Sequence, residues 1–367
     1  MDRTEVPAMP KIVLFGATGY TGRLIAQALA AHGDAPVLAG RNASSLAKLA
    51  TGVGGADTAV ADVTEPASVR ALLGRGDVLI TTVGPFLRYG QPALTAALAA
   101  GAHYFDSTGE GPFIRTVFDH DDEARRAGVA LLTAFGFDYV PGNLAAALAL
   151  AEAPDAVRAD IGYFIADPGT SGGTRASMAG MLFEDGFALR GGRVVSQRTA
   201  ARVRDFEVAG RTRTGASVPG SEHFALTRSY PQLREADVYL GLPGPAAHGL
   251  RATSLITATI AGVEPVKRLA ESALTRVVKG STGGPPSTAR ERTRTWAVAD
   301  VSDAAGRNLA SVTLTGVDPY DFTAAILAWG ARTALDGGLL GTGALGPVEA
   351  FGLDALTAGA TEAGISR

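Results

Sequence analysis

The first third of the chain alternates short runs of apolar residues with longer segments in which apolar residues recur every three or four positions. Such short runs are typical of buried parallel strands, and the periodic segments are typical of helices that cover them. The alternation therefore predicts a Rossmann-like parallel sheet. The predicted strands are Ile12–Phe15, Ala35–Ala39, Ala56–Ala61, Val78–Thr82, Tyr104–Asp106 and Ala130–Thr133, and the predicted helices are Gly22–Ala31, Ala43–Ala50, Pro66–Gly74, Gln91–Ala100 and Ile114–Ala127.

A second pattern begins after about residue 140, where the apolar segments become longer and Gly-rich turns separate them. We expect a second α/β domain with a mainly antiparallel sheet, in which Arg292–Val301 and Leu309–Val317 form a hairpin across "SDAAGRN". Composition alone predicts loops at 209–222 and 279–290, and the chain is helical again from Asp321. The expected division is a cofactor-binding domain at 10–140, a substrate and dimerisation domain at 141–320, and C-terminal helices at 321–367 that return to the first domain.

Composition narrows the classes of partner. The 367 residues are 46% hydrophobic, and 33 Lys and Arg against 36 Asp and Glu leave a net charge of −3. This balance argues against a nucleic-acid surface or a stable membrane contact and favours a small-molecule partner. The chain has no cysteine, which excludes disulfides, thiolate zinc sites and a cysteine nucleophile. Five histidines without metal-ligand spacing predict no metal, and the lack of a spanning apolar run or a signal peptide predicts a cytoplasmic protein.

The turn after the first strand reads "GATGYTG", with three glycines spaced three apart. Glycines at this position permit a tight turn, close approach of a pyrophosphate to the backbone, and close packing of the following helix. An ordinary Gly-rich turn has the same composition, but the apolar strand before the motif and the amphipathic helix after it favour a dinucleotide site. The predicted cofactor contacts here are Gly16, Ala17, Thr18, Gly19, Tyr20, Thr21 and Gly22.

The end of the second strand indicates which dinucleotide is bound. An acidic residue at this point suits the ribose of NAD, whereas an arginine suits the 2′-phosphate of NADP. The chain has Gly40, Arg41 and Asn42 there and no carboxylate, so we predict NADP(H), although Arg41 is also compatible with an exposed loop. Asp62 and Val63, after the third strand, are expected at the adenine edge, with Asp62 as a helix cap the alternative.

The fourth strand ends in "TTVGPF", which predicts a break where the carboxyl ends of parallel strands form a ligand crevice. Glycine in this segment would allow the cofactor to approach, and proline would fix the turn. A stiff connection into the next helix is the alternative. The residues assigned to the cofactor here are Val83, Gly84, Pro85 and Phe86.

Hydride transfer from a nicotinamide requires few side chains, because the cofactor carries the chemistry. The candidate catalytic residues are Tyr89, Asp138 and Tyr139, since a phenol or a carboxyl can donate a proton to the reduced substrate. Asp106 and Glu110, in "FDSTGE", are candidates for substrate binding. Each carboxylate is also compatible with a cap or a loop hydrogen bond, and each tyrosine with simple packing.

The segment "DPGTSGGTRASM" offers a competing class. It contains a literal G-x-S-x-G around Ser171, and His223 or His248 follows, which is the pattern of a serine hydrolase. The segment falls after the parallel array has ended, so substrate binding at a helix N-terminus fits better. The residues assigned to this role are Ser171, Gly172, Gly173 and Thr174. A third class is a protein that binds NADP(H) without turnover.

Four segments together resemble a known family: "GATGYTGRLIAQAL", "LAGRN", "TTVGPFLRYGQPALTAALAAGAHYFDSTGE" and "AFGFDYVPGNL". They resemble the saccharopine dehydrogenase-like oxidoreductases, and within them the branch that includes the trans-acting enoyl reductases. The resemblance is dense from Lys11 to about Leu144. It implies a Rossmann domain that binds NAD(P)H, an inserted α/β substrate domain and C-terminal helices that return to the first domain.

The resemblance also implies hydride transfer. The leading expectation is an NADPH-dependent reductase of an enoyl C=C bond in a lipid, polyketide or other secondary-metabolite intermediate, either free or bound to a carrier. The alternative is a saccharopine dehydrogenase-like reaction at a C=N or C–N bond of an amino-acid-derived substrate. A homodimer is compatible with the second sheet.

Overall fold

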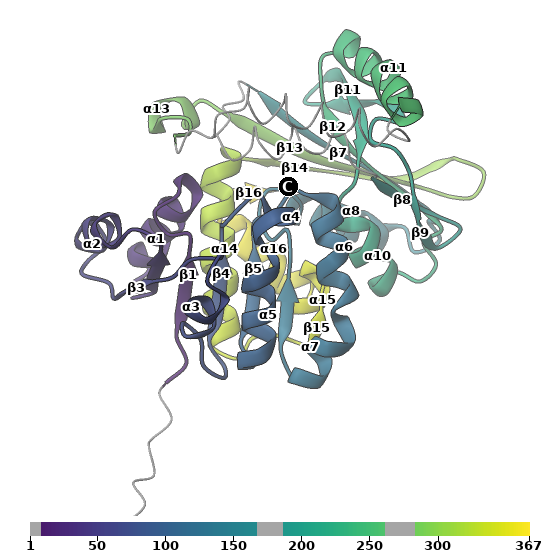
Figure 1. Cartoon of the computed structure of the whole chain (residues 1–367). Helices are drawn as coiled ribbons and strands as arrows, with labels where there is room; N and C mark the ends of the chain where they lie inside the picture. Colours follow the sequence, from purple (N-terminus) through teal and green to yellow (C-terminus); the bar gives the residue numbers. More distant parts are fainter. Residues whose placement is uncertain (1–8, 167–185, 261–282) are drawn as a thin grey trace, which may run out of the picture.

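The computed structural model describes residues 9–166, 186–260 and 283–367. Within these ranges the strands form two sheets, and the second sheet lies across one edge of the first (Figure 1). The predicted fold class is confirmed: one sheet is parallel and Rossmann-like, and the other is mixed and mainly antiparallel.

The first sheet contains seven parallel strands in the order β15-β6-β5-β4-β1-β2-β3. The short apolar runs of the sequence form its centre, because β1 and β4 are buried along their whole length. Its last strand comes from the C-terminal part of the chain and pairs with β6. The strands are β1 (Ile12–Phe15), β2 (Val37–Gly40), β3 (Thr58–Val60), β4 (Val78–Thr81), β5 (His103–Asp106), β6 (Ala130–Leu132) and β15 (Gly343–Ala344).

Helices cover both faces of this sheet, as parallel strands require. One of them, α14 (Pro319–Leu335), comes from the C-terminal part of the chain and packs against α1 (Tyr20–Ala31). The C-terminal helices therefore return to the first sheet, as expected. The other helices of this layer are α2 (Ala43–Gly52), α3 (Pro66–Arg70), α4 (Phe86–Tyr89), α5 (Gln91–Ala100), α6 (Gly111–Asp119), α7 (Asp121–Ala127), α15 (Pro347–Phe351) and α16 (Leu353–Glu362).

The second sheet has the main strand order β10-β11-β12-β7-β13-β14-β16, and β8 and β9 form a hairpin beside β12. The predicted hairpin of β13 and β14 is present. The prediction of a loop at 209–222 is wrong, because β11 occupies most of this segment and pairs with β10 and β12. The strands are β7 (Arg158–Ala166), β8 (Phe187–Arg190), β9 (Arg193–Ser196), β10 (Val203–Val208), β11 (Arg211–Val218), β12 (Glu235–Gly241), β13 (Arg294–Ser302), β14 (Asn308–Gly316) and β16 (Ile365–Ser366).

The two faces of the second sheet have different surroundings. Ile161 and Tyr163 of β7 belong to the apolar core that is continuous with the first sheet, whereas Phe164 belongs to a separate cluster on the opposite face. We call these the inner and the outer face. The helices of this region are α8 (Val140–Glu152), α10 (Glu222–Ser229), α11 (Gly244–Ile260) and α13 (Ser287–Arg290), and α8 packs on the inner face.

Among the described residues, no helix combines the length and the apolar character needed to cross a lipid bilayer.

Candidate functional site

The glycine turn after β1 is held against two neighbouring strands. The backbone N–H groups of Gly16 and Ala17 donate to the carbonyl of Ala39 at 2.9 and 3.1 Å. Gly16 has a φ of +89°, which favours glycine. A Cβ at Gly22 would overlap the Gly16 carbonyl and lie 2.9 Å from the Cα of Ala17, so α1 reaches this position only with glycine.

The start of α1 fits a pyrophosphate. No side chain caps its first turn, where Gly19 is the N-cap residue. The first-turn N–H groups of a helix lack partners within the helix and carry partial positive charge, so they favour an anion. The residues of the turn thus meet the steric and electrostatic requirements of a dinucleotide. A Cβ at Gly19 would lie 3.2 Å from the Gly16 carbonyl oxygen, so a side chain at this position would crowd the turn.

The loop after β2 presents Arg41 to solvent beside Gly40. The Asn42 side chain caps α2 by accepting the N–H of Ser45 at 2.9 Å, so its oxygen orients the loop. No carboxylate stands at the end of β2, and an exposed guanidinium there fits a 2′-phosphate.

Asp62 and Val63 follow β3 at the same edge of the sheet and are half-buried. The Asp62 carboxylate accepts both the N–H and the hydroxyl of Thr64 at 2.9 Å. These bonds, with a smaller effect from the charge of Arg41, lower the pKa of Asp62. The carboxylate thus stabilises its own loop, and it lies near enough to Arg41 for their charges to interact.

The loop after β4 touches the glycine turn. A Cβ at Gly16 would lie 2.6 Å from the hydroxyl of Thr82 and 3.0 Å from the side chain of Val83. Gly84 and Pro85 lead from there into α4, and Phe86 turns inward against Phe113, with 5.6 Å between the ring centroids. The structure therefore brings the loops after β1 and β4 together but buries the Phe86 ring.

Glu110 is engaged with the protein's own backbone. Its carboxylate oxygens accept the N–H groups of Phe86 at 2.9 Å and Leu87 at 3.0 Å, so it caps α4. The side chain is buried. The structure thus places this predicted substrate residue beneath the crevice, where it holds α4 in position.

Asp106 is fully buried at the end of β5. Its Oδ1 accepts the N–H of Ala134 at 2.8 Å, the N–H of Thr108 at 3.0 Å and the hydroxyl of Thr133 at 3.1 Å. Burial raises the pKa of Asp106 to about 6 despite these bonds. The carboxyl joins the ends of β5 and β6, so it shapes the crevice without opening into it.

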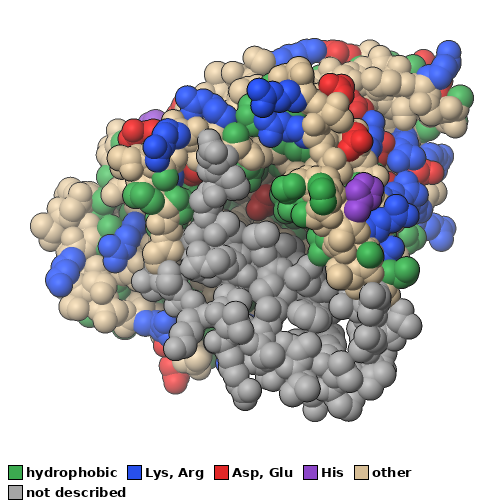
Figure 2. Space-filling model, turned by 90° about the horizontal axis from the view of Figure 1, so that it is seen from above, with side chains coloured by type: hydrophobic (Ala, Val, Ile, Leu, Met, Phe, Trp, Pro, Cys, Tyr) green, Lys and Arg blue, Asp and Glu red, His purple; other side chains and the backbone are tan. Residues whose placement is uncertain are grey.

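Asp138 is exposed to solvent, and protein groups also enclose its carboxyl. Its side chain is accessible to solvent, and a Cβ at Gly109, in the loop after β5, would lie 3.5 Å from its Oδ2. Desolvation by the enclosing protein raises the pKa of Asp138 to about 6. Figure 2 shows the molecule from above, and this face is hollowed near its centre. An accessible carboxyl with such a pKa can exchange protons near neutral pH.

Tyr139 is buried, and its ring packs against the ring of Tyr163 with a centroid distance of 5.6 Å. Burial, with smaller effects from the charges of Asp138 and Glu222, raises the pKa of Tyr139 well above its usual value. Tyr89 is half-buried at the end of α4, and the guanidinium of Arg88 lies 4.9 Å from its ring centroid. Of the three catalytic candidates, Asp138 is the exposed one, and its pKa is raised to about 6.

Sequence reasoning missed a buried pair beside Asp138. The hydroxyl of Tyr163 on β7 lies 2.6 Å from Oε1 of Glu222 on α10, and the N–H of Gly142 donates to the same hydroxyl at 2.8 Å. Burial, with a smaller contribution from the charge of Asp138, raises the pKa of Glu222 to about 8. No local signal distinguishes Glu222, because it follows a Gly-rich segment that reads as a loop.

Tyr20 of the glycine motif also contacts the segment 283–290, which precedes β13. Its hydroxyl donates to the carbonyl of Pro285 at 2.5 Å and accepts from Arg290 at 2.9 Å. Its ring meets that of Tyr320 edge to face at 5.1 Å. The segment 283–290, expected as a loop, therefore docks on the first residue of α1. The other proposed substrate residues, Ser171, Gly172, Gly173 and Thr174, lie outside the described residues.

Comparison with known proteins shows what the chain is similar to. Residues 12–132 match the family model of the saccharopine dehydrogenase NADP binding domain. A Mycobacterium tuberculosis protein named as a trans-acting enoyl reductase is 41% identical over 148 residues, which are 38% of this chain and 35% of that protein. The trans-acting enoyl reductase of Mycobacterium leprae is 40% identical over 140 residues, 36% of this chain and 34% of the relative. The chain thus matches only about a third of the length of these relatives.

The fold extends the match beyond the first sheet. The structure of apo saccharopine dehydrogenase (L-Glu forming) from Saccharomyces cerevisiae aligns with a TM-score of 0.59 at 15% identity, over 95% of this chain and 96% of that one. The resemblance inferred from the four sequence segments is confirmed, and so is NADP(H) as the cofactor. Residues 12–132 match the saccharopine dehydrogenase NADP binding domain, and the chain as a whole has a fold similar to that of saccharopine dehydrogenase.

Proposed function

We propose that this protein is an NADPH-dependent reductase that transfers a hydride to the C=C bond of an enoyl substrate. In this proposal residues 10–140 form the domain that holds the cofactor. The acceptor lies between this domain and the substrate domain at 141–320, where the carboxyl ends of the parallel strands face the second sheet. The relatives that match the cofactor-binding third of this chain are named trans-acting enoyl reductases, and this name supports the reaction class.

The observation that carries the proposal is the position of Asp138. It follows β6 at the edge of the sheet where the glycine turn also lies, and it is exposed while its pKa is raised to about 6. A general acid is most effective when its pKa is near the working pH. Tyr139, with a pKa held far above that range, is a poorer proton donor.

The proposed roles follow from this geometry. Bound NADPH supplies the hydride. The first-turn N–H groups of α1 orient the pyrophosphate, and Arg41 binds the 2′-phosphate. Reduction at the β-carbon of an enoyl thioester leaves an enolate, and protonated Asp138 donates its proton to the α-carbon. The resulting carboxylate is reprotonated from solvent, to which it is accessible.

The partner in this proposal is an organic acceptor, free or attached to a carrier, and the compartment is the cytoplasm, which a chain without cysteine suits. Glu110 and Asp106 shape the crevice through the backbone groups they bind rather than through substrate contact.

A direct assay tests the proposal. The purified protein with NADPH is supplied in parallel with a crotonyl thioester and with a cyclic imine, and loss of nicotinamide absorbance is recorded. We expect oxidation with the enoyl thioester, and we expect Asp138→Asn to bind NADPH normally and to turn over about 10²-fold to 10⁴-fold more slowly. If NADPH is oxidised with the imine and not with the enoyl thioester, the reaction is the reduction of a C=N bond and not of a C=C bond. Tight NADPH binding without oxidation by either acceptor would favour the binding protein without turnover.

A further inference from the structure

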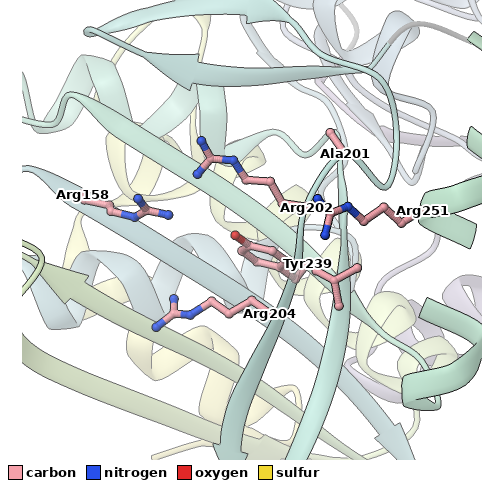
Figure 3. A pocket seen from close by; sticks show the side chains of 7 residues that line it. Arg158, Ala201, Arg202, Arg204, Tyr239 and Arg251 are labelled. Atoms are coloured by element: carbon pink, nitrogen blue, oxygen red, sulfur yellow. The ribbon is translucent and has the colours of Figure 1, made fainter. Parts of the chain in front are cut away.

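A second concavity lies on the outer face of the second sheet, away from the cofactor turn. It has a volume of about 290 Å³ and opens between β7, β10, β12 and α11. Figure 3 shows four guanidinium groups arranged around the Tyr239 ring. The lining residues are Arg158, Ala201, Arg202, Val203, Arg204, Tyr239 and Arg251.

Two buried carboxylates underlie this pocket and are shared among more guanidinium groups than they can neutralise. Asp237 lies 2.6 Å from Arg190, 3.1 Å from Arg202 and 3.7 Å from Arg158. Asp237 and the second carboxylate, Asp160, are both at least nine-tenths buried, so water screens their interactions poorly. With the two partners of Asp160, Arg158 and Arg204, four arginines compete for these two negative charges in the floor of the pocket.

Asp160 is the second of these carboxylates. It lies 2.9 Å from Arg158 and 2.8 Å from Arg204. The hydroxyl of Tyr239 also donates to Asp160, at 3.1 Å, which directs both the phenol and the carboxylate into the floor.

The outer partners do not restore neutrality. Glu235 pairs with Arg158 at 3.3 Å and Asp300 pairs with Arg204 at 2.8 Å, which adds two negative charges. Arg251 also lines the pocket, and it has no carboxylate partner in the described part of the chain. Five guanidinium groups, those of Arg158, Arg190, Arg202, Arg204 and Arg251, thus face four carboxylates, and the cluster keeps one positive charge in excess.

Unused hydrogen-bond donors face the opening. A guanidinium has five N–H groups. Arg202 donates to Asp237 through Nη1 only, and Arg251 makes no side-chain hydrogen bond within the described residues. Both side chains line the pocket. Planar donors of this kind bind phosphate oxygens in a bidentate manner, and desolvated charges strengthen the contact.

The sheet separates this pocket from the site of hydride transfer. Asp160 alternates along β7 with Ile161 and Tyr163, and Tyr163 contacts Glu222 on the inner face. Asp237 and Tyr239 alternate in the same way with Val238, which is part of the inner core. An occupant of the outer pocket is therefore neither the cofactor nor the hydride acceptor.

We propose that this pocket is a second ligand site, separate from the reductase site, and that it binds the diphosphate group of a small molecule. A diphosphate carries enough negative charge to match this excess, and its two phosphate groups can meet Arg202 and Arg251 together. The binding is electrostatic, so it weakens as the salt concentration rises.

Calorimetric titration of inorganic pyrophosphate into the protein saturated with NADPH tests the proposal, because NADPH then occupies the glycine turn and keeps pyrophosphate from binding there. We expect wild-type protein to bind pyrophosphate more tightly than inorganic phosphate or acetate. We expect Arg202→Gln and Arg251→Gln each to weaken pyrophosphate binding by at least about tenfold, since each removes a charge-assisted hydrogen bond.

Arg211→Gln is the matched control. Arg211 is exposed at the opposite end of the paired strands β10 and β11, where it pairs with Val208. This variant loses the same charge and should bind pyrophosphate as the wild type does. Arg251 is exposed on α11, so its substitution leaves the fold intact, which circular dichroism checks. No pyrophosphate binding by the NADPH complex, or equal binding by all three variants, would overturn the proposal.

Discussion

The phenol oxygen of Tyr163 lies 2.6 Å from Oε1 of Glu222, and this contact joins β7 of the second sheet to α10. The same oxygen lies 2.8 Å from the N of Gly142 and 3.1 Å from the carbonyl of Tyr139, both at the start of α8. The phenol donates to the Glu222 carboxyl oxygen and accepts the N–H of Gly142. The pair therefore holds the turn that follows Asp138.

The pair makes stability depend on pH. The pKa of Glu222 is about 8 in the folded protein and near 4.5 when the side chain is exposed in the unfolded chain. Between these values the folded state keeps a proton that the unfolded state has released, so stability falls as pH rises from about 5 to about 8. The slope is at most about 1.4 kcal/mol per pH unit.

Glu222→Gln removes this titration and keeps a neutral side chain of similar shape. Denaturant unfolding of both proteins at pH 5, 6, 7 and 8 should show the variant gaining stability relative to wild type as pH rises, by a few kcal/mol in total. Taking the difference between the two proteins cancels the titration of Asp106, which is not among the charges that act on Glu222. A difference that stays constant with pH would mean that Glu222 is ionised in the folded protein.

Gly142 lies so close to this pair that no side chain fits. A Cβ there would overlap the hydroxyl of Tyr163 and lie 2.6 Å from Oε1 of Glu222. Gly142→Ala should therefore lower the free energy of unfolding by about 1–3 kcal/mol, as overpacking does. Gly249→Ala is the matched control, because Gly249 is also helical but has open space where a Cβ would be. The control should be neutral or stabilising by up to about 1 kcal/mol, and equal losses in both variants would refute the packing argument.

The proton-donor role of Asp138 predicts the pH dependence of turnover. If the protonated carboxyl is the active form, kcat falls as pH rises through about 6, because that is the pKa of Asp138. Asp138→Asn should lose this limb together with most of the activity. Asp106 has a similar pKa but is fully buried, so Asp106→Asn should retain the limb. If the limb disappears in Asp106→Asn and persists in Asp138→Asn, the proton donor is Asp106 and not Asp138.

Arg41 predicts the choice of cofactor. Arg41→Glu replaces the proposed 2′-phosphate partner by a like charge, so it should weaken NADPH binding at least about tenfold more than NADH binding. Fluorescence titration with both nucleotides measures the ratio. Lys48→Glu makes the same change of charge on the exposed surface of α2 and should leave the ratio unchanged. An equal loss for both nucleotides in Arg41→Glu would remove Arg41 from the 2′-phosphate site.

Local patterns sufficed for the first sheet. Its strands are short apolar runs bounded by turn residues, and β1, β4 and β5 lie within one residue of their predicted positions. The glycine spacing sufficed for the cofactor turn, because a Cβ at Gly22 would meet Gly16 and Ala17, which are close in sequence, and because Gly16 has a positive φ. The β13–β14 hairpin likewise needed only the turn between two apolar segments.

Other strands are formed by contacts that no local pattern contains. β11 was expected as a loop because Thr, Arg and Gly dominate it, but pairing with β10 and β12 provides hydrogen-bond partners for its backbone on both sides. β15 and β16 are each only two residues long, and each adds to the edge of a sheet that earlier segments build.

The sequence by itself determined the fold class of the first sheet, its cofactor and the edge of that sheet at which we propose the chemistry, because these depend on strand order and on glycines spaced within one turn. Only the tertiary structure decided which polar side chains face that edge. Asp106 and Glu110 turned inward to bind backbone groups, whereas Asp138 stayed accessible. Tyr163 and Glu222 are 59 positions apart, and only the packing of the second sheet on α8 and α10 brings them together.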